Sequence, residues 1–411
     1  MRKTINTSYK FTIYILLSFF SSSLAATPLF DAYPKLKDHI PYKALGAIEA
    51  TPIIHAKSFE PNTHLYIKND GIDGTDKNGK KIFTGNKRRK LQFLLPDAQA
   101  HNAKCVYAAG LAGSNFATAT AAYAQDLGLT CTIVLGPQRN TRYAQRNLKL
   151  DLFYGANIIT CQTRKERIEI YKKLEETNHD GYFIPAGGSN KIGTIGFVDA
   201  AFEFKNQIDQ GIMPKPDVIY VTACTAGMAA GLIVGFKAAK LDIIVKSVRI
   251  ADTTKEIQDE LARLIKETSE YLHQYDESFP IVSIAPQELI VLGDLAGEKY
   301  IDLDHAQNER HKLLFSSPYA LAIPEAADAI ATLQSSTGIK LDGTYSGKTF
   351  AACLKDINSG ELKNKTVLFW NSFCPGSFSE YTDTVDTKKL PEELQKYFDG
   401  THPIQSLDQG V

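Results

Sequence analysis

The sequence has no excess of charge of either sign. Its 46 Lys and Arg residues balance 46 Asp and Glu residues, and the sequence pI is about 7.1. It also lacks a basic face interleaved with aromatic residues, which is the usual footprint of nucleic-acid binding. We therefore expect no nucleic-acid partner. This balance fits an enzyme that acts on small molecules.

The sequence also lacks closely spaced cysteines. None of its six cysteines forms a CxxC pair or a zinc-like spacing, so no metal site is expected. Cys105, Cys131 and Cys161 lie in or beside apolar, β-like runs, where cysteine behaves as a small buried hydrophobe. Most are expected to be free thiols, although an exported protein could oxidise some of them. The remaining three are Cys224, Cys353 and Cys374.

No apolar run is long enough for a comfortable membrane span. The run from Phe11 to Phe20 follows Arg2, Lys3 and Lys10, and a stretch of small residues ending in Leu24-Ala25-Ala26 comes after it. This order predicts a secretory signal peptide, residues 1–25. An uncleaved N-terminal anchor is the alternative. We expect an exported protein, periplasmic or secreted, with no membrane attachment after cleavage.

The chain shows no internal repeat, and its 411 residues suffice for a large core in two lobes. Short β-branched runs alternate with helical patterns, which predicts a parallel sheet with helices on both faces. Examples are the strand at Cys105–Ala108, the helix at Ser114–Leu127 and the strand at Cys131–Leu135. Further strands are expected at 157–160, 182–184, 217–222 and 366–370, with one extended stretch formed by 243–245 and 248–250. Further helices are expected at 164–176, 193–208, 227–240, 254–273, 324–336 and 347–358.

The predicted domains follow from this order. Residues 26–96 and 206–380 form a larger lobe, and residues 97–205 form a smaller one. Residues after about 381 form a polar C-terminal tail that carries Lys388, Lys389, Glu392 and Glu393.

Two turns that each open a helix are the most informative motifs. The first reads Thr84-Gly85-Asn86-Lys87-Arg88-Arg89-Lys90-Leu91, and the second reads Gly113-Ser114-Asn115-Phe116. A lysine after a Gly-Asn turn can place its amine near a helix N-terminus. A solvated basic cluster is the alternative interpretation of the first motif.

Together these motifs resemble the fold-type-II pyridoxal-phosphate enzymes, and among them the D-cysteine desulfhydrase and 1-aminocyclopropane-1-carboxylate (ACC) deaminase family. The family's lysine segment reads roughly GGNK-x-RKLE-x-L. The resemblance runs from about Thr51-Pro52 to about Gly376, through the segments 65–70 and 182–189. It implies a two-lobed, three-layer αβα fold like that of the tryptophan synthase β chain, with parallel-rich twisted sheets. It also implies a homodimer.

The resemblance implies pyridoxal 5′-phosphate as the cofactor and a small amino acid as the substrate. Lys87 matches the lysine that forms a Schiff base with the cofactor aldehyde and moves the α-proton. Asn115 matches a residue at the ring hydroxyl, and Ser114 one that binds the substrate carboxylate or shuttles a proton. Ser and Asn are also ordinary helix caps. The family often has His or Gln where this chain has Phe116.

The expected phosphate loop departs from the family pattern. A GSGGT-like run is usual, whereas this chain reads Cys224-Thr225-Ala226-Gly227-Met228 after a strand and before a helix. Backbone N–H groups at such a helix start bind phosphate whatever the side chains, so Thr225, Ala226, Gly227 and Met228 are expected to bind the cofactor. A tight β–α turn with alanine packing is the alternative.

Four further residues follow from the resemblance. Tyr319 and Tyr345 match two active-site tyrosines that can donate to a carboxylate or transfer a proton. ACC deaminases carry Glu and Leu where this chain has Ser346 and Ser372, and D-cysteine desulfhydrases carry small hydroxyl residues at both. Ser372 is expected beside the pyridine nitrogen of the cofactor.

These residues favour β-elimination from a small amino acid, with D-cysteine giving pyruvate, ammonia and sulfide. Lys87, Ser114, Tyr319 and Tyr345 are the candidate catalytic residues. ACC deamination is one alternative. A catalytically inactive, exported binding protein that keeps the fold is the other, because the phosphate loop, Phe116 and Phe373-Cys374 depart from the family pattern.

Overall fold

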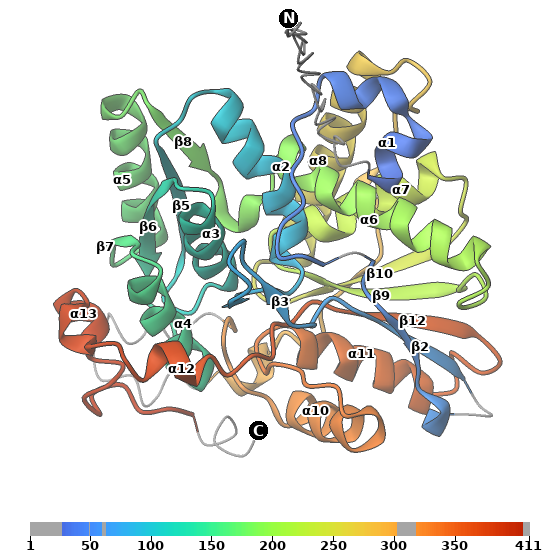
Figure 1. The fold of residues 1–411 in the computed structure, drawn as a ribbon. Helices are drawn as coiled ribbons and strands as arrows, with labels where there is room; N and C mark the ends of the chain where they lie inside the picture. The colour runs from blue at the N-terminus through green and yellow to red at the C-terminus, as the bar shows by residue number, and fades with distance from the viewer. Residues whose placement is uncertain (1–26, 49, 60–62, 302–317, 406–411) are drawn as a thin grey trace, which may run out of the picture.

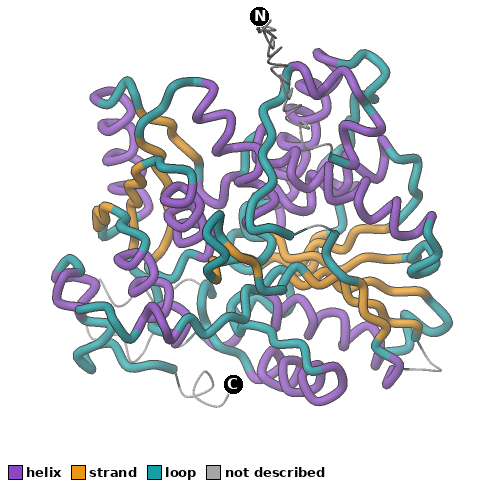
Figure 2. The backbone as a smooth tube through the Cα atoms, in the orientation of Figure 1, coloured by secondary structure: helices purple, strands orange, loops and turns teal. Residues whose placement is uncertain are grey.

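The structure, a computed structural model, describes residues 27–48, 50–59, 63–301 and 318–405. Two sheets, each covered by helices, form two lobes (Figure 1; Figure 2). The predicted signal peptide lies outside the described residues. Among the helices in the described ranges, none is long and apolar enough to span a bilayer.

The smaller lobe contains a four-stranded sheet in the order β7-β6-β5-β8. Its strands are β5 (Cys105–Leu111), β6 (Thr130–Gly136), β7 (Asn157–Thr160) and β8 (Gly181–Ile184), and all neighbours are parallel. Figure 1 shows α5 (Arg164–Thr177) on one face and α3 (Asn115–Asp126) on the other. Helix α4 (Arg142–Phe153) packs on α3.

The larger lobe contains a six-stranded sheet in the order β1-β2-β12-β9-β10-β11. All neighbours are parallel except the pair β1–β2. The strands are β1 (Ile53–His55), β2 (His64–Asn69), β9 (Val218–Ala223), β10 (Ile244–Arg249), β11 (Val291–Leu292) and β12 (Thr366–Asn371). A separate two-stranded ribbon, β3 (Gly74–Thr75) and β4 (Lys81–Ile82), lies between the lobes (Figure 1).

Helices cover both faces of the larger sheet (Figure 1). One face carries α6, α7 and α8, with α2 and the short α1 beside them, and the other carries α10 and α11. Their bounds are α1 (Pro28–Ala32), α2 (Lys87–Ala100), α6 (Lys191–Asp209), α7 (Gly227–Ala238), α8 (Thr254–Tyr275), α10 (Pro324–Thr337) and α11 (Ser346–Asn358).

Strand β12 shows why the sheet needs both helical layers. Leu368 and Trp370 are fully buried against the core that α6, α7 and α8 form. Val367 and Phe369 are fully buried in a second core beneath α10 and α11. Successive side chains of a strand point to opposite faces, so an unbroken apolar run marks a strand that is covered on both sides.

One predicted boundary differs from the structure. The sequence predicts the helix around 193–208 as part of the smaller lobe, yet α6 packs against α7 and α2 of the larger one. Glycines allow this approach, because a Cβ on Gly196 would lie 2.1 Å from the Arg89 carbonyl oxygen and one on Gly231 2.5 Å from that of Thr194. The extended stretch predicted from 243–245 and 248–250 is confirmed as strand β10.

The C-terminal segment is packed rather than simply polar. It contains α12 (Ser379–Thr382) and α13 (Glu392–Gln395). Leu390, Leu394 and Tyr397 are buried in the main core.

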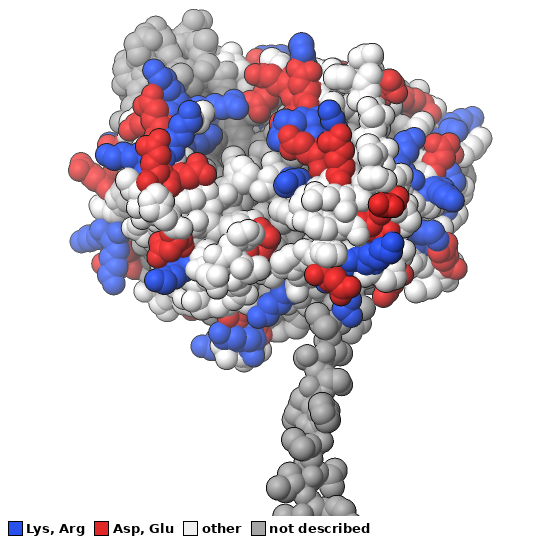
Figure 3. Space-filling model, turned by 90° about the horizontal axis from the view of Figure 1, so that it is seen from above, with Lys and Arg blue, Asp and Glu red and all other residues white. Residues whose placement is uncertain are grey.

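All six cysteines are free thiols. On the face seen in Figure 3, basic and acidic side chains are intermixed.

Candidate active site

Lys87 begins α2 directly after the Gly85-Asn86 turn. Gly85 has φ +77°, and a Cβ there would lie 3.1 Å from the Ser372 carbonyl oxygen. The Asn86 N–H donates to the same oxygen at 3.3 Å, which ties the start of α2 to the end of β12. The Lys87 ammonium lies 5.8 Å from the centroid of the Tyr345 ring. Burial lowers the pKa of Lys87, so its amine loses a proton more readily than an exposed lysine would.

The basic residues that follow Lys87 are buried, so their interpretation as a solvated cluster is wrong. Arg88, Arg89 and Lys90 are 3%, 2% and 4% exposed. The Arg89 guanidinium donates to the carboxylates of Asp70 at 2.8 and 2.9 Å and of Glu203 at 2.9 and 3.0 Å. This network fixes α2 to β2 and α6 behind the site.

Lys90 lies one helical turn beyond Lys87 and faces the start of α7. Its ammonium donates to the Gly187 carbonyl oxygen and to Ser189 Oγ, both at 2.9 Å. The Ser189 hydroxyl donates in turn to Thr225 Oγ1 at 2.7 Å. Burial and the nearby Lys87 charge hold the pKa of Lys90 well below its usual range. No carboxylate forms an ion pair with this ammonium in the part of the chain that the structure describes.

The loop between β9 and α7 forms a narrow concavity around this ammonium. Ala226 has φ 57° and caps α7 in the left-handed region, which alanine rarely occupies. A Cβ on Gly227 would lie 2.6 Å from Lys90 Nζ and 2.7 Å from Ser189 Oγ. Glycine is therefore required at this point. The thioether of Met228 contacts the start of α2, because its Sδ accepts from Asn86 Nδ2 at 3.4 Å.

Ser114 and Asn115 lie at the start of α3, immediately after β5. Ser114 Oγ accepts from the Ala117 N–H at 3.2 Å, as an N-cap does. Asn147 on α4 donates to Asn115 Oδ1 at 2.8 Å. Gln138 Oε1 accepts from the Gly113 N–H at 2.8 Å. The turn is thus held on both sides by amide side chains.

Tyr319 and Tyr345 come together from two different segments of the larger lobe. Their phenol groups share a hydrogen bond. Burial raises the pKa of both tyrosines. Lys348 donates to the Pro318 carbonyl oxygen at 3.1 Å, and Asp342 Oδ2 accepts from the Tyr345 N–H at 3.0 Å.

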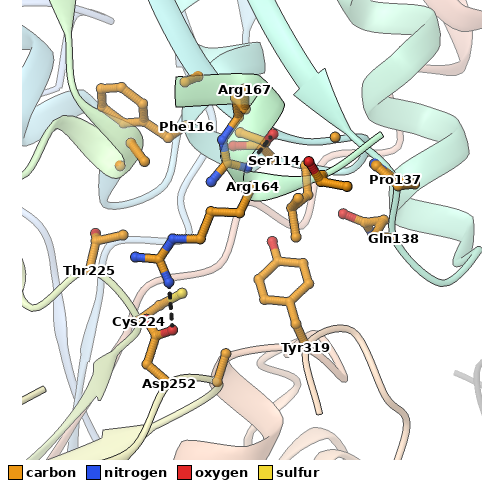
Figure 4. A pocket seen from close by; sticks show the side chains of 18 of the residues that line it. Ser114, Phe116, Pro137, Gln138, Arg164, Arg167, Cys224, Thr225, Asp252 and Tyr319 are labelled. Atoms are coloured by element: carbon orange, nitrogen blue, oxygen red, sulfur yellow. Dashed lines mark hydrogen bonds and ion pairs between the residues drawn. The ribbon is translucent and has the colours of Figure 1, made fainter. Parts of the chain in front are cut away.

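A cavity of about 630 Å³ opens between the lobes. Lys87, Ser114, Tyr319 and Tyr345 all line it, and Figure 4 labels Ser114 and Tyr319 among the lining residues. A smaller inner pocket of about 40 Å³ adjoins this outer cavity, and Lys87 and Tyr345 line both. The cofactor-binding candidates and Lys90 also line the inner pocket. These candidates are Asn115, Thr225, Ala226, Gly227, Met228 and Ser372. Thus all the candidate residues line one of two adjoining spaces.

Ser346 and Ser372, the two positions at which ACC deaminases differ from D-cysteine desulfhydrases, have different surroundings. Ser372 lines the inner pocket. Ser346 is fully buried, donates to Asp342 Oδ1 at 2.5 Å and lines neither space. Phe116 lines the outer cavity and packs on Gly188, where a Cβ would lie 2.5 Å from the phenyl ring.

A family model described as pyridoxal-phosphate dependent enzyme matches residues 44–300. The chain belongs to this family. Among curated relatives, the enzyme is 29% identical over 336 residues to a putative ACC deaminase of Pyrococcus horikoshii, covering 80% of this chain and 90% of the relative. It is 27% identical over 310 residues to a D-cysteine desulfhydrase of Yersinia pestis, covering 73% and 83%.

Solved structures show the same fold. The crystal structure of an ACC deaminase homologue has a TM-score of 0.65 at 24% identity and covers 91% of this chain and 100% of its own. A fungal L-serine ammonia-lyase from Rhizomucor miehei has a TM-score of 0.52 at 17% identity, covering 82% and 99%. The fold is therefore that of the fold-type-II enzymes, as the resemblance implied.

Pyridoxal 5′-phosphate is the cofactor of this family, and the lining of the inner pocket fits its phosphate group. The Lys90 ammonium, the hydroxyl groups of Ser189 and Thr225 and the first N–H groups of α7 surround one small concavity. Cations and helix N-termini are the usual partners of phosphate.

Within the described ranges, no group of three or more His, Cys, Asp or Glu side chains could hold a metal ion.

Sequence reasoning missed four residues that hold the site. Lys90 and Ser189 lie within quoted motifs but received no role, although Lys90 lies three residues after Lys87 and so shares its helix face. Gln138 and Asn147 had no sequence signal, because each acts through a contact between distant segments.

Proposed function

We propose that the enzyme catalyses β-elimination from a small amino acid, with D-cysteine giving pyruvate, ammonia and sulfide. The observation that carries this proposal is that Lys87, Ser114 and the Tyr319–Tyr345 pair line one cavity beside the cofactor pocket. A proton acceptor, a carboxylate site and proton donors thus surround a single small space.

When bound, pyridoxal 5′-phosphate supplies the electron sink that makes a Cα proton removable. Lys87 anchors the cofactor, and its Nζ accepts the Cα proton once a substrate amine has taken its place. The lowered pKa of Lys87 supports this role, because a general base must be available unprotonated near neutral pH.

Ser114 and the N-terminus of α3 bind the substrate carboxylate in this proposal. The first N–H groups of a helix have no acceptor within the helix, and the helix dipole favours an anion there. Ser114 Oγ adds a hydroxyl at the same end. Asn147 and Gln138 keep this turn in place through Asn115 and Gly113.

The tyrosine pair protonates the leaving group. Burial raises the pKa of Tyr319 and Tyr345, so both phenols keep their protons at neutral pH. The hydrogen bond between them lets one phenol donate to the departing sulfur while the other donates to the first. Water then releases the enamine product as pyruvate and ammonia.

Ser372 supports D-cysteine over ACC. Ser372 lines the inner pocket with Asn115 and Met228, and the resemblance associates a small hydroxyl residue here with D-cysteine desulfhydrases. Ser346 gives less support, because its hydroxyl is bonded to Asp342 away from the cavity. The relatives carry both names, so ACC deamination is the second candidate.

Product analysis of the cofactor-loaded protein tests the proposal. D-cysteine, L-cysteine and ACC are supplied separately, and pyruvate, sulfide and 2-oxobutyrate are measured. We expect pyruvate and sulfide from D-cysteine, and no activity in Lys87→Ala. Lys80→Ala, which changes an exposed lysine in the preceding loop, serves as the matched control and should retain activity.

The other outcomes separate the alternatives. 2-Oxobutyrate from ACC, without pyruvate from D-cysteine, would make the enzyme an ACC deaminase. If the loaded protein turned over none of these compounds or other small β-substituted amino acids, the inactive binding protein would become the better description.

We also propose that the protein is exported and forms a homodimer. The support for export is the residue pattern at 1–25, and the support for the dimer is family resemblance alone. Mass determination of protein recovered from a host cell's periplasm tests the first, with cleavage expected after Ala25. Light scattering tests the second, and a monomer mass at micromolar concentration would overturn it.

A further inference from the structure

The outer cavity carries more positive charge than the proposed reaction uses. Among the residues that the structure describes, four basic side chains line it, from Lys87, Arg164, Lys165 and Arg167, together with one carboxylate, that of Asp252. Lys87 serves the chemistry. The other three cations lie on the first turn of α5 in the smaller lobe, on the opposite lobe from Lys87.

Arg167 is the best placed of the three. Its Nη1 donates to the Gly110 carbonyl oxygen at 3.0 Å, and burial lowers its pKa. It forms no ion pair with any carboxylate in the described part of the chain. A guanidinium has five N–H donors in a planar fork, so one backbone bond leaves most of them for another partner. The side chain is partly buried, and removing such a cation from water without a paired anion is costly.

The position of Arg167 places it next to the reacting end of the cavity. Gly110 links it to Ser114, because a Cβ on Gly110 would lie 2.5 Å from Ser114 Cβ. Figure 4 shows the Arg167 guanidinium beside Ser114.

Arg164 extends the positive region across the mouth of the cavity. Its guanidinium lies 3.4 Å from Asp252 Oδ1 of the larger lobe, and its side chain is 71% exposed. An exposed pair of this kind is weak, so Arg164 can turn to another anion at little cost.

The substrate carboxylate alone does not account for this charge. Ser114 and the start of α3 already provide a site for it, and D-cysteine carries no other anionic group near neutral pH apart from a minor thiolate fraction. The cavity, at about 630 Å³, also has room for a longer side chain.

We infer that Arg167, assisted by Arg164, binds a second negative charge on the side chain of the substrate, so that the preferred substrates are β-substituted alanines whose leaving group carries a carboxylate or another anion. This inference rests on the proposed function and deepens it, because it names the class of β-substituted amino acids that the site prefers. The reaction itself is unchanged. The Cα–H and Cβ–S bonds break, the Cα–Cβ double bond forms, and the thiol that carries the second negative charge leaves with a proton on its sulfur.

A pair of isosteric substrates tests the inference. S-carboxymethyl-D-cysteine and S-carbamoylmethyl-D-cysteine differ only in a terminal carboxylate or amide. With the cofactor-loaded wild type we expect kcat/KM for the carboxylate to exceed that for the amide by about tenfold, the usual scale of a charge-assisted hydrogen bond. The difference should appear mainly in KM.

Variants of α5 assign the preference to Arg167. In Arg167→Gln the ratio of the two kcat/KM values should fall about tenfold, and Arg167→Lys should retain part of it. Arg164→Gln should lower it less. Lys172→Gln, which removes an exposed charge on the same helix outside the cavity, is the matched control and should leave the ratio unchanged.

Several results would overturn the inference. An equal kcat/KM for both compounds in the wild type would do so even if every variant failed to fold. So would an equal loss for both compounds in Arg167→Gln, which would assign Arg167 to the substrate α-carboxylate. Turnover of D-cysteine without a charge preference would overturn the inference and leave the proposed function intact, whereas no turnover of any amino acid would remove both.

Discussion

The phenol of Tyr397 bridges the two backbone polar groups of Gln138. It accepts from the Gln138 N–H at 2.8 Å and donates to the Gln138 carbonyl oxygen at 2.6 Å. Gln138 Oε1 in turn accepts from the Gly113 N–H, at the turn that carries Ser114. The C-terminal segment therefore reaches the substrate side of the cavity through a single intervening residue.

Removal of the Tyr397 hydroxyl should impair catalysis more than it impairs folding. Tyr397→Phe loses both bonds to Gln138, and we expect a loss of about 1–2 kcal/mol in the free energy of unfolding together with a several-fold rise in KM. Denaturant unfolding and steady-state kinetics measure the two effects. Tyr381→Phe, which loses one bond to the Lys81 carbonyl oxygen, is the control. A KM equal to that of the wild type would show that the contact is merely structural.

Lys90 should set the affinity for pyridoxal 5′-phosphate. Its ammonium lies at the concavity that Gly227 leaves open, and a charge-assisted bond to phosphate contributes about 1.5–3 kcal/mol. We expect Lys90→Gln to bind the cofactor at least tenfold more weakly in a visible-absorption titration, with Lys87 still able to bind it. Lys80→Gln provides the comparison. Unchanged affinity in Lys90→Gln would place the phosphate elsewhere.

The buried Arg89 should be required for stability. Arg89→Met would leave the carboxylates of Asp70 and Glu203 without their principal cation, and breaking a buried ion pair from one side costs about 3–5 kcal/mol. Chemical denaturation measures this loss. Arg263→Met removes an exposed cation that pairs with Glu260 and Glu267 on α8, and should cost about 1 kcal/mol or less. Similar losses in the two variants would contradict the role of burial.

Local sequence patterns predicted most of the elements. Helix α8 begins at Thr254, and its buried residues Ile257, Leu261, Leu264 and Leu272 follow helical spacing, so periodicity was sufficient. Helix α4 was not predicted. Its first turn is polar, and its buried polar residues Asn147 and Asp151 interrupt the apolar stripe.

The sequence predicted those residues of the candidate site that lie in recognisable local motifs. Lys87, Ser114 and the loop at Thr225 each open a helix after a turn, which sequence alone displays. The contacts of Gln138 with Gly113 and of Ser189 with Thr225 join segments 25 and 36 residues apart. The bonds from Tyr397 span 259 residues. No local pattern encodes such contacts, because they depend on how the two lobes and the C-terminal segment pack.

Asp199 should make stability depend on pH through the N-terminal helix. Asp199 Oδ1 accepts from the Leu29 N–H at 2.9 Å, and burial, partly offset by this bond, raises the pKa of its carboxyl from 3.8 to about 6. The folded chain therefore holds this proton more tightly than the unfolded chain does. The resulting stabilisation is fully present below the unfolded pKa and is lost as pH rises through the folded one.

An Asn at this position cannot titrate and can still accept from Leu29. As the pH rises from 4 to 7, we therefore expect the free energy of unfolding of Asp199→Asn to increase relative to that of the wild type, by up to about 3 kcal/mol. Denaturant unfolding at unit steps of pH measures the difference. Asp209→Asn, at the exposed end of the same helix, is the control and should leave the wild-type pH profile in place. A constant difference between Asp199→Asn and the wild type across this range would mean that Asp199 stays charged when the chain folds, and that the Leu29 N–H and its surroundings offset the cost of burying that charge.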